Sequence, residues 1–155
     1  MEFQNTIAYG TFYAEGGEIT LNLGNYTEFD FAPTVGTVKN CHAYSTSNFQ
    51  IAIEQTGTYF IEFSFTAENG DGKTYYIQPY KNGNTYLPVG QDMSIRFYQQ
   101  PTEQKYEVST HGLFNLRRGD YIEWKLFSPA SASSLALLTN NIKMNLFNLQ
   151  QIGLH

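Results

Sequence analysis

The chain has 155 residues, of which 16% are aromatic and only 15% charged, with a formal net charge of -5 at pH 7. A chain of this length is sufficient for one domain with a two-layer core, and we expect that single domain to span residues 1–155. The nine Lys and Arg residues are scattered apart from the pair Arg117-Arg118. This argues against nucleic acid as a partner, because a phosphate backbone requires clustered cations.

The sequence contains no recognisable membrane or secretory segment. Residues 1–5 have neither the basic region nor the apolar stretch of a signal peptide. No apolar run approaches the roughly 18 residues of a membrane-spanning helix, so we expect no membrane insertion. The single cysteine, Cys41, has no partner for a disulfide within the chain, and we expect it to be a small buried side chain.

Short segments with alternating apolar and polar residues follow one another along the chain, and each predicts a strand. These segments are 7–13, 19–23, 49–53, 57–66, 75–81, 94–98, 106–116, 121–127 and 143–149. Clusters of Gly, Asn and Asp predict turns at 16–17, 24–25, 69–72, 82–84 and 119–120. Residues 131–138 predict a single helical turn at most. About ten short strands without a long helix predict an all-β, two-sheet antiparallel jelly-roll sandwich.

Five short motifs, taken in order, resemble one known family, the globular heads of complement q and tumour necrosis factor. They are Ala-Tyr-Gly-Thr-Phe-Tyr at 8–13, Phe-Gln-Ile at 49–51 followed by Gly-Thr-Tyr at 57–59, Tyr-Lys-Asn-Gly at 80–83, Leu-Arg-Arg-Gly-Asp at 116–120, and Met-Asn-Leu-Phe at 144–147. The resemblance covers residues 7–149 and implies a ten-stranded jelly roll that assembles as a homotrimer. A bacterial or bacteriophage member is expected, because the chain has no collagen-like repeat and no internal disulfide.

The sequence offers little support for catalysis or for a metal centre. The three histidines, His42, His111 and His155, are far apart in sequence, whereas a cupin-type metal site needs a close His-x-His pair. The chain also lacks a Gly-x-Ser-x-Gly nucleophile motif. The segment Asn-Gly-Asp-Gly-Lys at 69–73 is either a calcium loop or a solvated connection, and we favour the connection. We therefore expect no enzyme activity, no metal and no cofactor.

Several predicted strands carry apolar residues on both faces, which predicts a second burial surface besides the core. The alternative is loose patterning with no partner. Under the first interpretation, the candidate residues of a trimer interface are Tyr9, Phe12, Phe60, Leu113, Phe147 and Leu149. Tyrosines in or near loops combine a flat apolar ring with a polar tip, and Tyr44, Tyr86 and Tyr98 are the candidate ligand-binding residues.

The expected function is that of a homotrimeric, non-catalytic head with a structural or receptor-binding role. The expected setting is a bacteriophage fibre or another virion surface protein, on the virion or in the extracellular space. Three equivalent sites would bind a cell-surface glycan or protein at the same time, which raises the avidity of binding. The alternatives are a free-standing, monomeric carbohydrate-binding lectin domain and a hydrolase or cupin-like enzyme.

Overall fold

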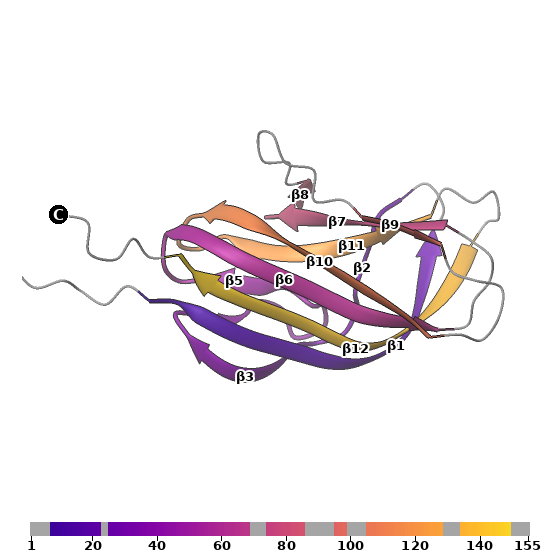
Figure 1. Ribbon diagram of the computed structural model, residues 1–155, viewed down its shortest axis with the longest axis horizontal. Helices are drawn as coiled ribbons and strands as arrows, with labels where there is room; N and C mark the ends of the chain where they lie inside the picture. The colour runs from indigo at the N-terminus through magenta and orange to yellow at the C-terminus, as the bar shows by residue number, and fades with distance from the viewer. Residues whose placement is uncertain are drawn as a thin grey trace, which may run out of the picture.

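The computed structural model describes residues 7–22, 25–68, 74–85, 95–98, 105–128 and 134–149. These residues form two antiparallel sheets packed face to face, and none of them is in a helix (Figure 1). In chain order the strands are β1 (Tyr9–Asn22), β2 (Thr27–Glu28), β3 (Thr34–Lys39), β4 (Cys41–Ala43), β5 (Ile51–Ile53), β6 (Gly57–Glu68), β7 (Thr74–Lys81), β8 (Asn84–Thr85), β9 (Ile95–Tyr98), β10 (Tyr106–Leu116), β11 (Tyr121–Phe127) and β12 (Ser134–Asn148). The predicted all-β jelly-roll sandwich is confirmed.

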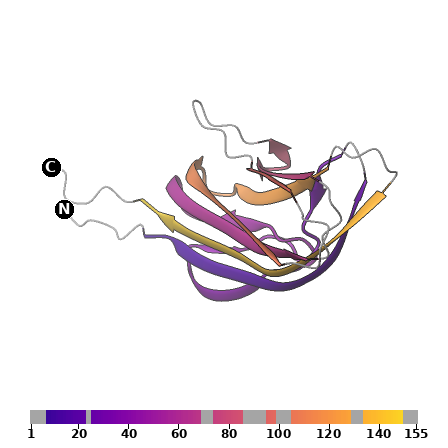
Figure 2. The same ribbon diagram turned by 45° about the vertical axis from the view of Figure 1, so that its right-hand side comes forward.

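The two sheets differ in the length of their strands. Sheet A has the order β10-β6-β12-β1-β3 and contains the four longest strands, with β12 at its centre between β6 and β1. Sheet B has the order β4-β5-β11-β7-β8, with β2 paired to β11 and β9 paired to β7. Figure 2 shows the two layers, with β1 and β12 crossing beneath β11. The start of β1 and the end of β12 are paired, so they lie at the same end of the sandwich (Figure 1).

The core between the sheets is aromatic. The alternation predicted for residues 57–66 is confirmed, because Tyr59, Ile61, Phe63 and Phe65 are all buried on the inner side of β6. Phe63 stacks on Trp124 of sheet B, with ring centroids 4.9 Å apart. The ring of Phe114 packs edge-on against Trp124, with centroids 5.6 Å apart. Offset and edge-on ring pairs are the favoured arrangements of aromatic side chains, so these contacts join the two layers.

Two of the predicted turns match the structure closely. Asn82 and Gly83 both have positive φ, 53° and 81°, in the β7–β8 connection, as the Asn-Gly pair predicts for a tight hairpin. Gly119 has a φ of 95° in the turn between β10 and β11. The turns predicted at 24–25 and 69–72 involve residues outside those described.

The turn predicted at Gly16-Gly17 is wrong, because β1 runs through it as one strand of 14 residues. Gly16 has a φ of 96°, and a Cβ atom there would lie 2.2 Å from the carbonyl oxygen of Thr139 on β12. Gly16 therefore allows the backbone of β12 to come close to β1 at an irregular position inside the strand, and the chain does not reverse there.

The helical turn predicted within 131–138 is also wrong for its described part, since β12 begins at Ser134. Residues 134–139 pair with β1 from Asn22 back to Gly17. Pairing with a distant strand thus overrides a local sequence preference. The short strands β2, β4 and β8 and the exposed strand β3 were not predicted, because segments of this kind carry too little alternation to be recognised.

Candidate subunit interface

The outer face of sheet A presents a continuous row of apolar side chains. The strand register aligns Tyr9 with Phe147, Phe147 with Phe60, and Phe60 with Leu113, so that one residue from each of four neighbouring strands lies in the row. Tyr9, Leu113 and Phe147 are 38%, 40% and 45% exposed, although all three are large apolar side chains. We call these four residues the apolar row.

Contacts within the apolar row hold its rings together. The centroids of Phe60 and Phe147 are 5.3 Å apart, a distance typical of cross-strand aromatic pairs. Leu149 follows the end of β12, has the same strand parity as Phe147 and is 44% exposed. Its backbone N–H donates to the carbonyl oxygen of Thr58 over 2.7 Å, which holds Leu149 against the start of β6. Leu149 therefore extends the apolar row beyond the strand.

The prediction that Phe12 belongs to the interface is wrong. Phe12 is fully buried in the core. Side chains alternate between the faces of a strand, and Phe12 is three positions from Tyr9, so the two side chains point to opposite faces. Phe12 is therefore a core residue. The structure places Tyr9, Phe60, Leu113, Phe147 and Leu149 together on the outer face, and it adds Tyr13, which is also exposed.

A polar row runs beside the apolar row, two residues away from it along each strand. In this row Thr11 pairs with Asn145, Asn145 with Glu62, and Glu62 with His111. The His111 ring lies 5.6 Å from the Phe60 ring, so the two rows touch. An apolar strip with polar residues along one side is the general pattern of an interface core and its rim.

An irregularity in β12 hollows the outer face further along the sheet. The register of β12 with β6 shifts between Asn140 and Lys143, and Asn141 has a φ of 53°. Two hollows flank this point, one of about 300 Å³ that reaches Glu107 and one of about 420 Å³ that reaches Tyr13. Lys143 lines both hollows. The outer face of sheet A therefore has both exposed apolar side chains and an uneven, hollowed surface.

Of the predicted ligand-binding tyrosines, the structure describes Tyr44 and the backbone of Tyr98, and these two lie in different parts of sheet B. Tyr44 follows β4 at one edge of sheet B, is 52% exposed, and stacks on Tyr121 with centroids 4.1 Å apart. The backbone of Tyr98 ends β9, which pairs with β7 toward the opposite edge of sheet B. Tyr86 and the side chain of Tyr98 lie outside the described residues. Tyr44 therefore stands alone as a described candidate.

The described residues contain no assembled metal-binding group. No set of three His, Cys, Asp or Glu side chains among them is close enough to hold a metal ion. His42 pairs with Glu54, Nδ1 to Oε2 at 3.0 Å, in an exposed position. The segment 69–73, considered above as a calcium loop, lies outside these residues. The described part of the chain also contains no helix long and apolar enough to cross a membrane.

Burial raises the pKa of four described groups, Cys41, Tyr59, Tyr121 and Glu123, and two of them bear on the chemistry of the chain. Burial raises the pKa of the Cys41 thiol to about 11, so the thiol stays protonated at neutral pH and is a poor nucleophile. Its Sγ donates to the carbonyl oxygen of Tyr9. Glu123 in β11 is 1% exposed, and burial raises the pKa of its carboxyl. Gln50 Nε2 donates to Glu123 Oε2 over 3.0 Å, whereas Oε1 has no hydrogen-bond partner within the described structure.

The strand order and the two-layer packing place the chain in the class of jelly-roll folds seen in tumour necrosis factor and complement 1q heads, and comparison with solved structures shows the same. Tumour necrosis factor Eiger from S. frugiperda superposes with a TM-score of 0.57 at 11% identity over 96% of this chain and 98% of that one. Murine APRIL gives 0.56 at 14% identity, over 91% and 99%. The globular domain of zebrafish complement 1qA gives 0.57 at 12%, over 93% and 98%. At these identities the likeness is one of fold. No family model matches the sequence, and no curated protein matches it.

Proposed function

We propose that the protein is a homotrimeric, non-catalytic head with a structural or receptor-binding role. The observation that carries this proposal is the apolar row on the outer face of sheet A. The inner face of that sheet already forms the core, so the row needs a second burial surface. The jelly roll of the complement q and tumour necrosis factor family supports a trimer as the assembly that covers it.

The setting we propose is a bacteriophage fibre or another virion surface protein, exposed outside the cell. A rigid trimer presents three equivalent sites, which raises avidity for a cell-surface glycan or protein without any new contact. The contacts between subunits would be heterologous and closed by threefold rotation. Permanent interfaces of this kind bury on the order of 2,000 Å² or more and resemble a protein core.

The test is the solution mass by light scattering after size exclusion, over a dilution series. We expect about 53 kDa, three times the 17.6 kDa chain mass, and we expect that mass to survive dilution to low micromolar concentration. A stable 17.6 kDa species would contradict the trimer. In that case the free-standing lectin would become the leading function, since the exposed Tyr44 ring stacked on Tyr121 is a suitable platform for a sugar ring.

A further inference from the structure

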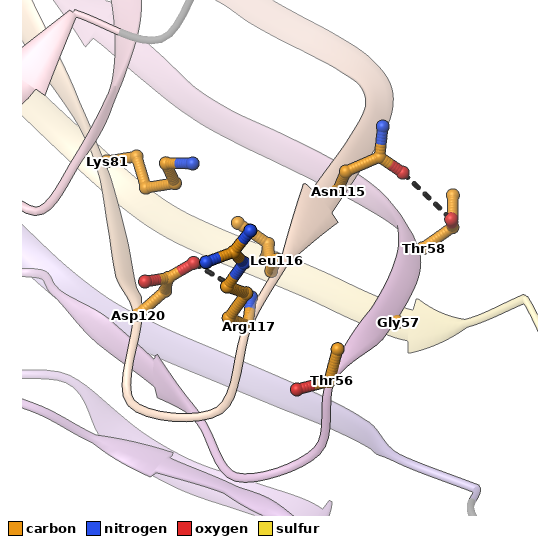
Figure 3. A pocket seen from close by; sticks show the side chains of 8 residues that line it. All are labelled: Thr56, Gly57, Thr58, Lys81, Asn115, Leu116, Arg117 and Asp120. Atoms are coloured by element: carbon orange, nitrogen blue, oxygen red, sulfur yellow. Dashed lines mark hydrogen bonds between the residues drawn. The ribbon is translucent and has the colours of Figure 1, made fainter.

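Along β6 and β10, the apolar row lies between two polar pairs that differ in their chemistry. On the side toward the start of β6, Thr58 pairs with Asn115, and Thr58 Oγ1 donates to Asn115 Oδ1 over 2.9 Å (Figure 3). On the other side, in the polar row, Glu62 pairs with His111. The first pair is neutral and joined by a hydrogen bond, whereas the second pair consists of two groups that change charge with pH.

The Glu62–His111 pair is free to take up a proton. Both side chains are exposed in the single subunit. Residues directly opposite each other in an antiparallel pair have Cβ atoms about 4.5–5.5 Å apart, so the carboxylate and the imidazole are within reach of one another. Within the described part of the chain, neither side chain has a hydrogen bond or an ion pair.

A partner that covers the apolar row also covers this pair. The His111 ring lies 5.6 Å from the Phe60 ring, which lies 5.3 Å from the Phe147 ring. Burial of the two phenylalanines against the next subunit therefore removes water from His111 and from Glu62 opposite to it. Taking a carboxylate out of water without a partner is strongly unfavourable, whereas a paired or protonated carboxyl is tolerated.

Lys143 of β12 is a cation on the same face, but several carboxylates surround it. The register places Lys143 diagonal to Glu62. Lys143 also lines one hollow with Glu107 and the other with Glu15. One ammonium group thus faces three carboxylates and does not compensate all of them. The other two members of the polar row are neutral, so a proton on the Glu62–His111 pair is the remaining means of compensation within the row.

We propose that the Glu62–His111 pair takes up a proton in each subunit when the trimer forms, so that the trimer is tighter at pH 6 than at pH 8. Imidazole is the side chain whose charge ordinarily changes in this range. If His111 takes the proton, it pairs with the carboxylate, and if Glu62 takes it, two neutral groups remain. Both arrangements hold one more proton, and the state that binds more protons is favoured as pH falls. This inference rests on the proposed trimer and adds regulation of its interface by pH.

The experiment is fluorescence-detected sedimentation of the full chain, labelled at its N-terminal amine, from nanomolar to micromolar concentration at pH 6.0 and 8.0. We expect the concentration at which half of the chains are trimeric to be at least about fivefold lower at pH 6.0. His111→Gln should reduce this ratio to within about twofold, and Glu62→Gln should abolish or reverse it, because an imidazolium would then be buried unpaired. The matched control is His42→Gln, which removes an exposed histidine from sheet B and should keep the parent ratio.

A parent trimer with the same midpoint at both pH values would overturn this inference and leave the trimer standing. A ratio that persists in His111→Gln, or that is lost equally in His42→Gln, would also overturn it. A monomer at every concentration and at both pH values would contradict the trimer itself. If the parent stays fully trimeric at nanomolar concentration, Phe147→Ser is the background for the same comparison, because it weakens association and leaves the pair intact. Circular dichroism verifies that each variant is folded.

Discussion

Glu123 is the least favourably placed ionisable residue among those described. Its strand parity matches that of Tyr121 and Lys125, so it lies on the outer side of β11, yet it is 1% exposed and only Oε2 has a hydrogen bond. Desolvation disfavours the charged form, which is why the pKa of this carboxyl is raised above its ordinary 4.5. The folded protein therefore binds this proton more tightly than the unfolded chain does.

Because of this raised pKa, Glu123→Gln should change the pH dependence of stability. The stabilisation from protonating Glu123 is fully present below pH 4.5 and is lost as pH rises through the folded-state pKa. We therefore expect the Gln variant to be more stable than the parent at pH 7.5, by about 1 kcal/mol or more, with the difference shrinking toward pH 4. Urea unfolding at fixed protein concentration across pH 4–8 measures it.

The matched control for Glu123→Gln is Glu18→Gln, because Glu18 is an exposed carboxyl on β1. Its free energy of unfolding should follow that of the parent at every pH. A Glu123→Gln variant that loses the same amount of stability at pH 4 and pH 7.5 would show that the side chain acts through packing or its bond to Gln50, and that its ionisation has no part.

Among the elements, β1 shows most clearly what the sequence can and cannot predict. Its period-two pattern predicted strands on both sides of Gly16-Gly17, and both were found. The same pattern also contained the correct position of Phe12, because the parity from Tyr9 places it in the core. The continuity through Gly16 could not be read locally, since it depends on the approach of β12 from more than a hundred residues away.

The apolar row on sheet A was only partly predictable, again because it depends on pairing between distant strands. Apolar residues on both faces of β6, β10 and β12 are visible in the sequence. Their alignment into one row depends on the register of three long-range strand pairings, which the sequence does not specify locally.

Gly16→Ala should destabilise the protein more than the loss of a flexible residue accounts for. The new Cβ atom would lie 2.2 Å from a backbone oxygen of β12, and the residue would keep a φ of 96°. We expect a loss well above the roughly 1–2 kcal/mol that a left-handed alanine costs, because backbone on β12 has to move. Denaturant unfolding of the purified variant provides the measurement.

Gly119→Ala separates the two contributions to that loss. Gly119 has nearly the same φ, 95°, but nothing lies within 4 Å of its added Cβ. It should therefore lose only the conformational amount, about 1–2 kcal/mol. Equal losses in the two variants would show that β12 relaxes freely around position 16 and that the close approach does not constrain the sheet.

On the scale of the whole molecule, the two sheets differ in what their outer faces offer a partner. Sheet A is built from the long strands and carries the apolar row, the polar row and the hollows beside Lys143. At the edge of sheet B, the exposed Tyr44 ring stacks on Tyr121. A closed ring of copies requires one surface of each subunit to receive a different surface of the next, and a long, uneven apolar face is well suited to be the receiving one.

The receiving role proposed for sheet A predicts the effect of Phe147→Ser. Phe147 lies inside the apolar row, between Tyr9 and Phe60, and its side chain is outside the core, so the subunit itself should stay folded. Removing the ring of an aromatic hot spot at the centre of an interface costs about 2 kcal/mol or more. We expect the trimer to dissociate on dilution to low micromolar concentration, which light scattering would show, with the thermal midpoint of the subunit largely retained.

The matched control for Phe147→Ser is Tyr44→Ser, which removes a comparably exposed ring from the other sheet. The trimer should persist in this variant over the same dilution series. If Phe147→Ser stays trimeric while Tyr44→Ser dissociates, the association surface is on sheet B and the apolar row of sheet A is free to bind a partner. If both variants stay trimeric, the association energy lies in contacts away from the centre of the row, and Leu113→Ser and Leu149→Ser are the next positions to measure.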